Sequence, residues 1–465
     1  MARGKKKETL TPEERLQAAL VPESEQPYKV PGNWCWTQLG TYIDFATDYV
    51  ANGSFASLKQ NVAYYKEENY AILVKTQDFS NSFTEDLTYT DKHGYDFLKK
   101  SVLYGGELIL SNIGSIGKVF RVPHLNKPMT LAPNSIMIKC YRETDYDLLY
   151  YYFLSPFGTE QLYSITTGTA VKKFNKTDLK AICLPLPPLS EQQRIVDRIE
   201  SLFAKLDEAK QKAQDALDSF ETRKAAILHR AFTGELTAQW RKEHGVGMES
   251  WKEETLESVC YSIFDGDHMP PPKSEQGIPF LVISNVNTGH LSFENTRFVP
   301  ESYYEALSDT RKPEYGDVLY TLVGSYGIPV IVDREHPFCF QRHMALLKPK
   351  NIDSYYLWYI LQSREMFEKA TQIATGTAQL TVPIKGLRQL KFNCASANEQ
   401  GEIVRILDDL LAKEQQAKDA AEGVLEQIDL IKKAILTRAF RGELGTNDPS
   451  EESAQELIKN FIFKM

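Results

Sequence analysis

The chain has 465 residues, of which 42% are hydrophobic and 25% are charged. These fractions are ordinary for globular proteins, so they exclude a disordered or low-complexity chain, and the length predicts about two to four domains. The formal net charge of −8 lacks the basic excess that nucleic-acid-binding proteins commonly carry. A nucleic-acid function therefore has to be argued from the organisation of the chain.

The sequence carries no signal for a membrane, a secretory route or a metal site. No apolar run approaches the roughly 18 residues of a membrane helix, and the charged N-terminus is followed by polar residues rather than by an apolar signal segment. The cysteines are scattered without a Cys-x-x-Cys pair, which disfavours a zinc site or a disulfide framework and suits a reducing compartment. We expect a cytoplasmic protein without a metal site.

The N-terminal tail, residues 1–33, contains one predicted helix start. Thr11 is a suitable N-cap, Pro12 suits the first helical position, and Glu13 and Glu14 place acids in the first turn. A frayed tail is the alternative to a helix that packs near the C-terminus. The apolar side chains available for such packing are Leu16, Ala19 and Leu20.

Residues 34–188 form the first of two regions that mix short strands with short helices. Ala71–Val74 and Glu107–Ser111 are predicted strands, and the tyrosine-rich segment Tyr150–Leu154 predicts a short buried helix. One later loop contains Lys172, Lys173 and Lys176 beside Asn175. Such a loop suits contacts with phosphates and bases, and a merely solvated lysine loop is the alternative.

Residues 189–248 contain a predicted long helix. From Ile195 its apolar residues recur at alternating steps of four and three, which is the a/d pattern of a coiled coil. Pro187, Pro188 and Ser190 mark its start, with Ser190 as a candidate cap. The stretch of about 30 residues would be roughly 45 Å long. A surface helix with a core-facing stripe and a homodimeric coiled coil are the alternatives to an intramolecular antiparallel pair.

Residues 249–396 and 397–444 repeat this mixed and helical order. In the second mixed region, Pro279–Ile283 and Asp317–Thr321 are predicted strands and Tyr355–Ile360 is a predicted buried helix. The second heptad pattern begins at Ile403 and has one polar breach, at Glu414. Residues 445–465 form a C-terminal tail, which we expect to be a flexible acidic linker as far as residue 455 and then a short helix.

The two halves are a duplication. The segment Ala-Ile-Leu-x-Arg-Ala-Phe-x-Gly-Glu-Leu begins at Ala226 and recurs 208 residues later at Ala434. The tetrapeptide Thr-Gly-Thr-Ala at Thr167 recurs at Thr375 with the same offset, and Gly114-Ser-Ile-Gly matches Gly324-Ser-Tyr-Gly with an offset of 210. A chain with two such halves suits a pseudo-symmetric target or two copies of one partner.

The repeated Arg-Ala-Phe-x-Gly-Glu-Leu ends each helical region, at 230–236 and 438–444. Its glycine is a predicted C-cap or turn. The arginine, phenylalanine and glutamate either form a packing or docking surface or serve only in local capping.

Catalytic motifs are missing from the sequence. Lys118 follows Gly117 as in a P-loop, but Asn112 and Val119 occupy positions that a P-loop requires to be Gly and Ser or Thr. The sequence has no dinucleotide fingerprint, no metalloprotease helix motif and no nucleophile elbow. The Asn/Asp-Pro-Pro-aromatic motif of DNA amino-methyltransferases is also missing. This pattern favours a binding protein over an enzyme.

The motifs resemble a known family. Residues 184–196 read Leu-Pro-Leu-Pro-Pro-Leu-Ser-Glu-Gln-Gln-Arg-Ile-Val and precede the long helix that ends in Arg-Ala-Phe-x-Gly-Glu-Leu. Together with the duplicated layout, these segments resemble the specificity subunit of a type I restriction–modification system over almost the whole chain. The second copy departs from the pattern, because Ala395-Ser-Ala-Asn-Glu-Gln lacks the prolines.

The resemblance implies an α+β fold with two pseudo-repeated α/β target-recognition domains, separated by two long helices packed as an antiparallel coiled coil. Each recognition domain would contact one half of a bipartite, asymmetric double-stranded DNA site, and the helices would set the unread spacer. The chain itself would be non-catalytic and bind no cofactor. Two methyltransferase subunits would bring S-adenosylmethionine, and two translocase–nuclease subunits would bring ATP and Mg²⁺.

The resemblance also places the candidate contacts. The candidate DNA-contacting residues are Lys75, Gln77, Asn112, Ser115, Lys118, Thr169, Lys172, Lys173, Asn175, Ser284, Asn285, Ser325, Tyr326, Thr377 and Gln379. The candidate helical and partner-docking residues are Ile195, Ile199, Leu202, Leu206, Arg230, Phe232, Ile403, Leu407, Leu410, Arg438 and Phe440.

Three other functions compete with this interpretation. A coiled-coil adaptor with two protein-binding heads would bind no DNA, with or without partners. An enzyme that cuts or methylates DNA alone would need the missing motifs. A system that methylates and never restricts would use the same chain.

Overall fold

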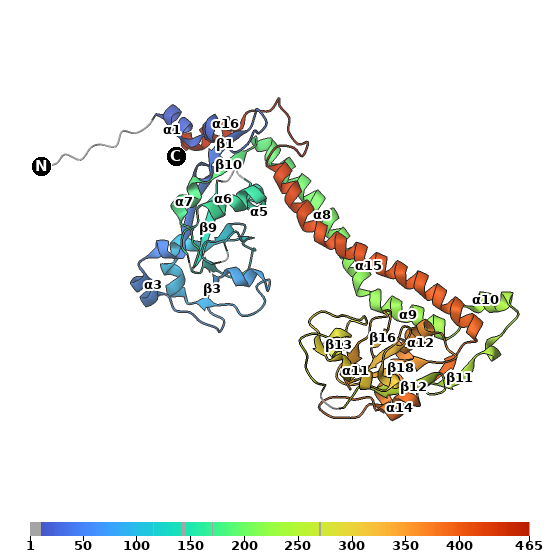
Figure 1. The fold of residues 1–465 in the computed structure, drawn as a ribbon. Coiled ribbons are helices and arrows are strands. Elements are labelled where there is room, and N and C mark those ends of the chain that lie inside the picture. The colour runs from blue at the N-terminus through green and yellow to red at the C-terminus, as the bar shows by residue number, and fades with distance from the viewer. Residues whose placement is uncertain (1–10, 115, 142–144, 170, 269–270, 465) are drawn as a thin grey trace. The chain divides into compact units, whose positions relative to one another are not determined.

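The computed structural model describes residues 11–114, 116–141, 145–169, 171–268 and 271–464 (Figure 1). The chain divides into two units. Unit 1 combines Met1–Lys212 with Val424–Met465, and unit 2 is Ala213–Gly423. Each unit therefore holds one mixed α/β region and a part of each helical region, and the C-terminal end of the chain belongs to the first unit.

Unit 1 contains two four-stranded sheets and one two-stranded pair. Their strand orders are β2-β9-β6-β7, β4-β3-β8-β5 and β1-β10, and only the β3–β8 pairing is parallel. The strands span Cys35–Gln38 (β1), Ile43–Asp48 (β2), Ala71–Val74 (β3), Tyr89–Thr90 (β4), Val102–Leu103 (β5), Leu108–Ser111 (β6), Val119–Arg121 (β7), Met129–Leu131 (β8), Ser135–Cys140 (β9) and Cys183–Leu186 (β10).

Unit 2 repeats this arrangement with one strand fewer, because its second sheet has three strands. Its strand orders are β12-β18-β15-β16, β14-β13-β17 and β11-β19, and only the β13–β17 pairing is parallel. The strands span Lys252–Thr255 (β11), Cys260–Asp265 (β12), Ile278–Leu281 (β13), Arg297–Val299 (β14), Val318–Thr321 (β15), Pro329–Ile331 (β16), Cys339–Phe340 (β17), Met344–Pro349 (β18) and Lys391–Cys394 (β19).

The strand registers confirm the duplication. Leu108 of β6 lies opposite Arg121 of β7, and Val318 of β15 lies opposite Ile331 of β16. The offset is 210 for both residues of the pair, the same as between the two glycine-serine turns that follow β6 and β15. The predicted strands at β3, β6, β13 and β15 are present, and every residue of β3, β6 and β15 is buried.

Both units also contain α-helices. They span Pro12–Ala19 (α1), Leu39–Tyr42 (α2), Phe55–Asn61 (α3), Lys92–Phe97 (α4), Tyr146–Leu154 (α5), Pro156–Ser164 (α6), Lys176–Ala181 (α7), Leu189–Asp218 (α8), Phe220–Phe232 (α9), Ala238–Glu243 (α10), Glu301–Ala306 (α11), Ser354–Leu361 (α12), Arg364–Ile373 (α13), Ile384–Arg388 (α14), Ala397–Ala439 (α15) and Ala454–Lys464 (α16). The tyrosine-rich segments form α5 and α12, whose aromatic residues are largely buried, as expected.

The two long helical segments are not identical. The second copy is one helix of 43 residues, α15, whereas the first copy is divided at Ser219 into α8 and α9. The Ser219 hydroxyl donates to the Asp215 carbonyl, and the Arg223 guanidinium bonds both to Ser219 Oγ and to the Ala216 carbonyl. These side chains compete for backbone acceptors at the division, whereas the matching residue in α15 is Gln427.

The helical segments run antiparallel within each unit. In unit 1, Lys432 of α15 forms an ion pair with Asp207 of α8 at 2.6 Å. In unit 2, Arg223 of α9 pairs with Glu414 of α15 at 2.8 Å. The second pair explains the polar breach in the heptad pattern, because the carboxylate at that seam position meets a guanidinium from the facing helix.

A buried glutamate at the start of each long helix fastens it to its recognition region. Glu191 is fully buried, and its carboxylate accepts hydrogen bonds from Trp34 Nε1 at 2.7 Å, Thr446 Oγ1 at 2.9 Å and Asn447 Nδ2 at 2.9 Å. These donors come from the N-terminal end of the recognition region and from the C-terminal segment of the chain. One carboxylate therefore joins three distant parts of the sequence.

Glu399 occupies the matching position in unit 2. It is also fully buried and accepts from Trp251 Nε1 at 2.8 Å and Thr237 Oγ1 at 2.6 Å. Its third donor is charged, since Arg241 Nη1 lies 2.5 Å away. The helix starts are equivalent in spite of the missing prolines, because the carbonyl of Ser396 accepts from the Glu399 amide as the carbonyl of Pro188 accepts from the Glu191 amide.

The expectation that Ser190 caps the first long helix is wrong. The helix begins at Leu189, before that residue, and the carbonyl of Pro188 accepts from the amides of Glu191 and Gln192. Ser190 lies in the first turn, where its own carbonyl accepts from Arg194.

The prediction of a flexible linker over residues 445–455 is also wrong. Besides the bonds to Glu191, Asn33 Nδ2 donates to the Asp448 carbonyl, and Glu451 forms a two-pronged ion pair with Arg194 of α8. The short terminal helix is present as α16, which contacts α1. Thr11 and Glu14 form a complete capping box at the start of α1. Helices α1 and α16 thus pack together within unit 1.

We expect Glu399→Gln to loosen unit 2 more than Glu191→Gln loosens unit 1. The first substitution leaves the buried Arg241 without a charged partner, which costs about 3 kcal/mol, whereas the second weakens bonds from neutral donors and costs about 1 kcal/mol. Hydrogen exchange resolves the two units, so we expect faster exchange in β11 and β19 for the first variant. Equal protection losses in both variants would contradict this account.

Candidate nucleic-acid interface

Two of the predicted contact loops lie together in unit 1. The loop after β6 and the loop before α7 are joined by backbone bonds from Gly114 to Lys172 and from Phe174 to Asn112, at 3.1 Å each. The Asn112 side chain adds a third link, because its Nδ2 donates to the Phe174 carbonyl. Thr167 and Lys173 close the second loop on itself with a pair of backbone bonds.

The same two loops meet in unit 2. Gly324 donates to the Leu380 carbonyl and Val382 donates to the Leu322 carbonyl, while Thr375 and Thr381 exchange backbone bonds. The added Cβ of an alanine at Gly324 would lie 3.1 Å from Gln379 Nε2, so Gln379 sits directly over the glycine turn. The fold therefore brings the predicted residues of each half together in the same way.

A third loop joins each pair at the strand ends. In unit 1 the end of β3 leads into a 3-10 turn at Thr76–Phe79, and the amide of Ala132 donates to the Val74 carbonyl. The amide of Asn112 donates to the carbonyl of Asn134. Residues 132–134 therefore lie between the loop after β3 and the loop after β6.

Unit 2 has the same connection through residues 341–343. Gln341 donates to the Leu281 carbonyl at the end of β13, and Leu322 donates to the His343 carbonyl at the end of β15. We call residues 132–134 and 341–343 the central segments. Each candidate interface consists of one central segment and the three loops around it.

Most of the predicted contact residues are available at the surface. Lys75 and Tyr326 are half-buried, and Ser115 lies outside the described residues. The exposed members of the set are Gln77, Lys118, Thr169, Lys172, Lys173, Asn175, Ser284, Ser325, Thr377 and Gln379.

Two of the predicted asparagines use their side chains for hydrogen bonds within the protein. Asn285 is only 6% exposed, its Oδ1 accepts from the Val282 amide and its Nδ2 donates to the Glu294 carbonyl. Both ends of this amide are used inside the protein, so the proposed contact of Asn285 with a base conflicts with the structure. Asn112 spends its amide nitrogen on Phe174, as described above, and its Oδ1 is buried.

The corresponding turn of unit 1 uses an aspartate. Asp78 is buried, and its Oδ2 accepts from the Lys75 amide, as Asn285 accepts from Val282. Burial raises the pKa of Asp78 above its ordinary value, while the backbone bond from Lys75 acts in the opposite direction. Lys75 itself donates from Nζ to Thr88 Oγ1. Gln77 is then the exposed side chain of this turn.

Sequence reasoning missed several residues that the fold places at these sites. Arg342 is exposed and His343 half-buried in the central segment of unit 2. In unit 1, Phe55 is 81% exposed beside a cavity that is also lined by Tyr64 and by Pro133 of the central segment. An unusually exposed aromatic side chain cannot be recognised from the sequence, because exposure depends on the tertiary fold.

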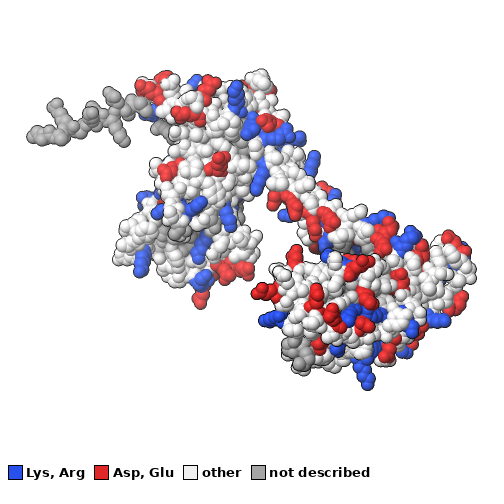
Figure 2. All heavy atoms as spheres, viewed as in Figure 1, with Lys and Arg blue, Asp and Glu red and all other residues white. Residues whose placement is uncertain are grey.

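Charged side chains of both signs are mixed on the visible face of the molecule (Figure 2). On the face drawn in Figure 2, Lys and Arg atoms are interspersed with Asp and Glu atoms. Within the lysine loop, the Lys172 ammonium lies 5.8 Å from the centre of the Tyr163 ring. Among the described residues, no group of three or more His, Cys, Asp or Glu side chains could hold a metal ion, and no described helix could cross a membrane.

The predicted helical residues turn out to be mostly internal. Phe232 packs on Tyr356 and Phe440 packs on Tyr152, so these phenylalanines fill the cores of their units and cannot form a docking surface. The buried members of the predicted set are Ile195, Ile199, Phe232, Ile403, Leu407 and Phe440, and the half-buried members are Leu202, Leu206 and Leu410.

The arginines of the repeated motif remain exposed. Arg230 pairs with Glu235, and Arg438 donates to the Glu443 carbonyl. The glycines that follow have positive φ, +81° at Gly234 and +73° at Gly442, as the predicted C-terminal turn requires.

Comparisons with known proteins identify relatives of this architecture. The chain matches the family described as "Type I restriction modification DNA specificity domain" over residues 50–217 and 248–422. It is 24% identical to the type I restriction enzyme EcoKI specificity subunit of Escherichia coli over 406 residues, which cover 83% of this chain and 85% of that protein. It is 25% identical to the MjaVIII specificity subunit of Methanocaldococcus jannaschii over 355 residues, 72% of this chain and 78% of that protein.

Solved structures share the fold. The crystal structure of the HsdS subunit from Thermoanaerobacter tengcongensis superposes with a TM-score of 0.61 and 22% identity, covering 90% of this chain and all of that one. A chain from a study of assembly and conformational transition of the type I restriction–modification system gives a TM-score of 0.62, with 21% identity and the same coverage.

The two glycine turns offer a matched pair of substitutions. Gly114 and Gly324 both have positive φ, so alanine costs about 1–2 kcal/mol at either position. Among the described residues, the Cβ added at position 324 meets Gln379, whereas the Cβ added at position 114 meets none within 4 Å. We expect Gly324→Ala to speed hydrogen exchange in residues 375–382 more than Gly114→Ala does in residues 167–174. The reverse order would contradict the contact between Gly324 and Gln379.

Proposed function

The chain belongs to the type I restriction–modification DNA specificity family, and from this membership we propose that it is the non-catalytic subunit that selects the DNA sequence for a methyltransferase and restriction complex. Each recognition domain contacts one half of a bipartite, asymmetric site in double-stranded DNA. The long helices set the spacer between the halves and carry the partner subunits. Family membership favours this function over a coiled-coil adaptor that binds no DNA.

One observation carries the proposal beyond family membership. Both units build the same three-loop arrangement around a central segment with the same backbone bonds, yet the exposed side chains differ. Unit 1 presents Lys172 and Lys173, where unit 2 presents Leu380 and the half-buried Thr381. A common scaffold with different side chains is what two unequal half-sites require, because hydrogen-bonding groups on base edges carry the sequence information.

Two chemical groups among the exposed residues suit contacts with DNA. Gln77 and Gln379 suit the N6 and N7 atoms of adenine, and the lysines suit guanine or phosphate. Asn175 is exposed but also caps α7, since its Oδ1 accepts from the Asp178 amide. We therefore place the strongest candidates for base contact at Gln77 and Gln379, and the strongest candidates for phosphate contact at Lys172 and Lys173.

Partners supply the chemistry in this proposal. Two methyltransferase subunits bind S-adenosylmethionine and methylate adenine, and two translocase–nuclease subunits use ATP and Mg²⁺. The complex works in the cytoplasm. The acidic net charge of this chain is compatible with DNA binding, because the partner subunits can enclose the duplex and provide most of the basic surface. The same chain would serve a system that only methylates.

Lys172→Ala with Lys173→Ala tests the phosphate contacts. We expect weaker DNA binding by the assembled complex and a smaller slope of log affinity against log salt, by about 1 for each lost phosphate contact. Lys210→Ala with Lys212→Ala on α8 changes the net charge equally and should leave the slope unchanged. An identical slope for both double variants would remove the lysine loop from the interface.

Genome-wide mapping of adenine methylation tests the function itself. The chain is expressed with the methyltransferase subunit, and we expect a split motif with a fixed gap that disappears when the gene for this chain is deleted. Replacing residues 34–188 by those of a relative should change one half of the motif and keep the other half. Methylation without any motif, or a motif unaffected by the deletion, would contradict the proposal.

A further inference from the structure

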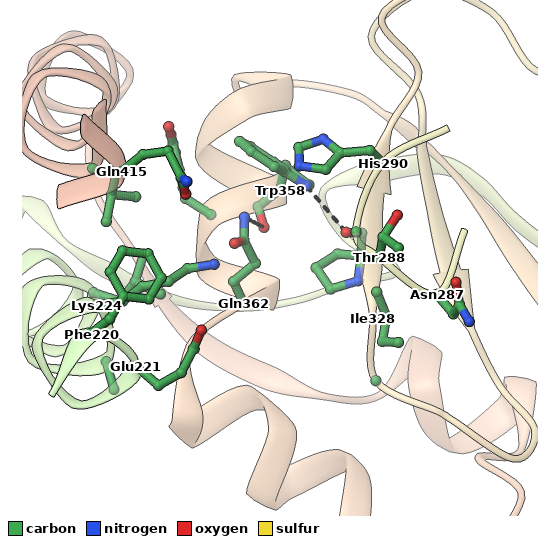
Figure 3. A pocket seen from close by; sticks show the side chains of 17 residues that line it. Phe220, Glu221, Lys224, Asn287, Thr288, His290, Ile328, Trp358, Gln362 and Gln415 are labelled. Carbon is green, nitrogen blue, oxygen red and sulfur yellow. Dashed lines mark hydrogen bonds between the residues drawn. The ribbon is translucent and has the colours of Figure 1, made fainter. Parts of the chain in front are cut away.

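Unit 2 contains a cavity in a region where the equivalent part of unit 1 has larger side chains. The cavity measures about 530 Å³ and lies between the helical segments and the recognition region (Figure 3). Phe220 and Lys224 of α9 and Gln415 of α15 line one side. Trp358 of α12 and Gln362, which follows that helix, line the other. The rest of the lining comes from a short loop that contains Asn287, Thr288 and His290 and from residues 327–329.

The duplication identifies the equivalent residues of unit 1. Tyr359 donates to Asp408 of α15 at 2.6 Å, and the matching Tyr151 donates to Glu200 of α8 at 3.3 Å. This shared contact shows that helix and recognition region meet in the same way in both units. Residue for residue, Phe203, Asp207 and Lys432 of unit 1 therefore correspond to Leu411, Gln415 and Lys224 of unit 2.

In unit 1 these three residues contact one another. The Phe203 ring packs edge-on against Tyr151 with ring centres 5.8 Å apart, and the Lys432 ammonium lies 5.0 Å from the centre of the Phe203 ring. Asp207, one helical turn after Phe203, pairs with Lys432 at 2.6 Å. An aromatic ring and a carboxylate four residues apart thus satisfy the lysine.

Unit 2 has the matching lysine, Lys224, but lacks both the aromatic ring and the carboxylate that contact Lys432 in unit 1. Leucine replaces the aromatic ring at position 411, and glutamine replaces the carboxylate at position 415. A second large side chain is also missing, since Arg121, which covers the Tyr150 ring at 4.4 Å in unit 1, corresponds to Ile331. These smaller residues leave space beside Trp358, the counterpart of Tyr150.

The lysine of unit 2 is left without a partner in the described part of the chain. Lys224 is half-buried and forms no ion pair, hydrogen bond or ring contact there. Glu221 also lines the cavity, but among the described residues no ion pair joins it to Lys224. Its counterpart in unit 1 is Asp429, not the Asp207 that pairs with Lys432. A half-buried cation beside an aromatic wall favours an anionic partner that also carries apolar surface.

We propose that this cavity of unit 2 is a docking site for a helical segment of the methyltransferase subunit that carries an aromatic residue and, four residues later, a carboxylate. The aromatic ring fills the space beside Trp358 and Phe220, and the carboxylate pairs with Lys224. The segment thus supplies from outside what Phe203 and Asp207 supply within unit 1. Only one of the two equivalent places in the chain accepts it, so the two docking positions are unequal. This inference rests on the proposed function, which names the methyltransferase as a partner.

The test fills the cavity with the side chains of unit 1. Leu411→Phe with Gln415→Asp provides the ring and the carboxylate internally, and Lys224→Glu removes the cation. We expect both variants to bind the purified methyltransferase subunit at least about tenfold more weakly than the unaltered chain. In the filled variant Lys224 already has a carboxylate partner, and in Lys224→Glu the carboxylate of the docking segment meets a negative charge. The filled variant should melt at the same temperature as the unaltered chain or higher, which excludes misfolding.

Lys432→Glu is the matched control. It reverses the charge of the equivalent lysine in unit 1, where the partly exposed pair with Asp207 adds little stability. We expect an affinity within about twofold of the unaltered chain. Equal losses for Lys224→Glu and Lys432→Glu, or unchanged binding of the filled variant, would overturn the docking site while leaving the proposed function in place. Loss of binding to the translocase–nuclease subunit alone would overturn the assigned occupant. Failure of the unaltered chain to bind the methyltransferase would overturn both proposals.

Discussion

The fold depends on one buried carboxylate in each unit. Glu191 and Glu399 begin the two long helices, and each accepts a hydrogen bond from the tryptophan that opens its recognition domain. A buried carboxylate is costly unless donors surround it, so the helix, the recognition domain and the segment that supplies the remaining donors must come together. In both units that last segment follows the other long helix in the sequence. Each unit is therefore incomplete until both helical regions have folded against each other.

The two halves share their internal bonds and differ at their surfaces. The shared bonds are internal: the glutamate network, the strand registers and the backbone links that hold three loops around each central segment. The differences lie at the loop tips and in the cavity of unit 2, where Lys224 has lost the partners of its counterpart. A duplicated chain can vary these surfaces without disturbing the bonds that hold the units together.

The C-terminal segment shows how composition can mislead. Residues 445–455 are polar and acidic, which is typical of a linker, yet Thr446, Asn447 and Glu451 bond to Glu191 and Arg194 of the first long helix. Their partners lie about 250 residues earlier in the chain. The same limit applied to Asn285, whose residue type suits adenine but whose buried amide supports its own loop.

The sequence by itself determined the duplication, the order of the regions, the long helices and the short strands, because repeats, heptad spacing and apolar runs are local patterns. It also indicated the loops that the fold then brings together, since glycine turns and clustered lysines are visible in the chain. Only the tertiary structure decided which residues of those loops are exposed, that the repeated phenylalanines are internal, and that unit 2 has a cavity beside Lys224. Exposure and cavities depend on residues far apart in the sequence, and no local pattern records them.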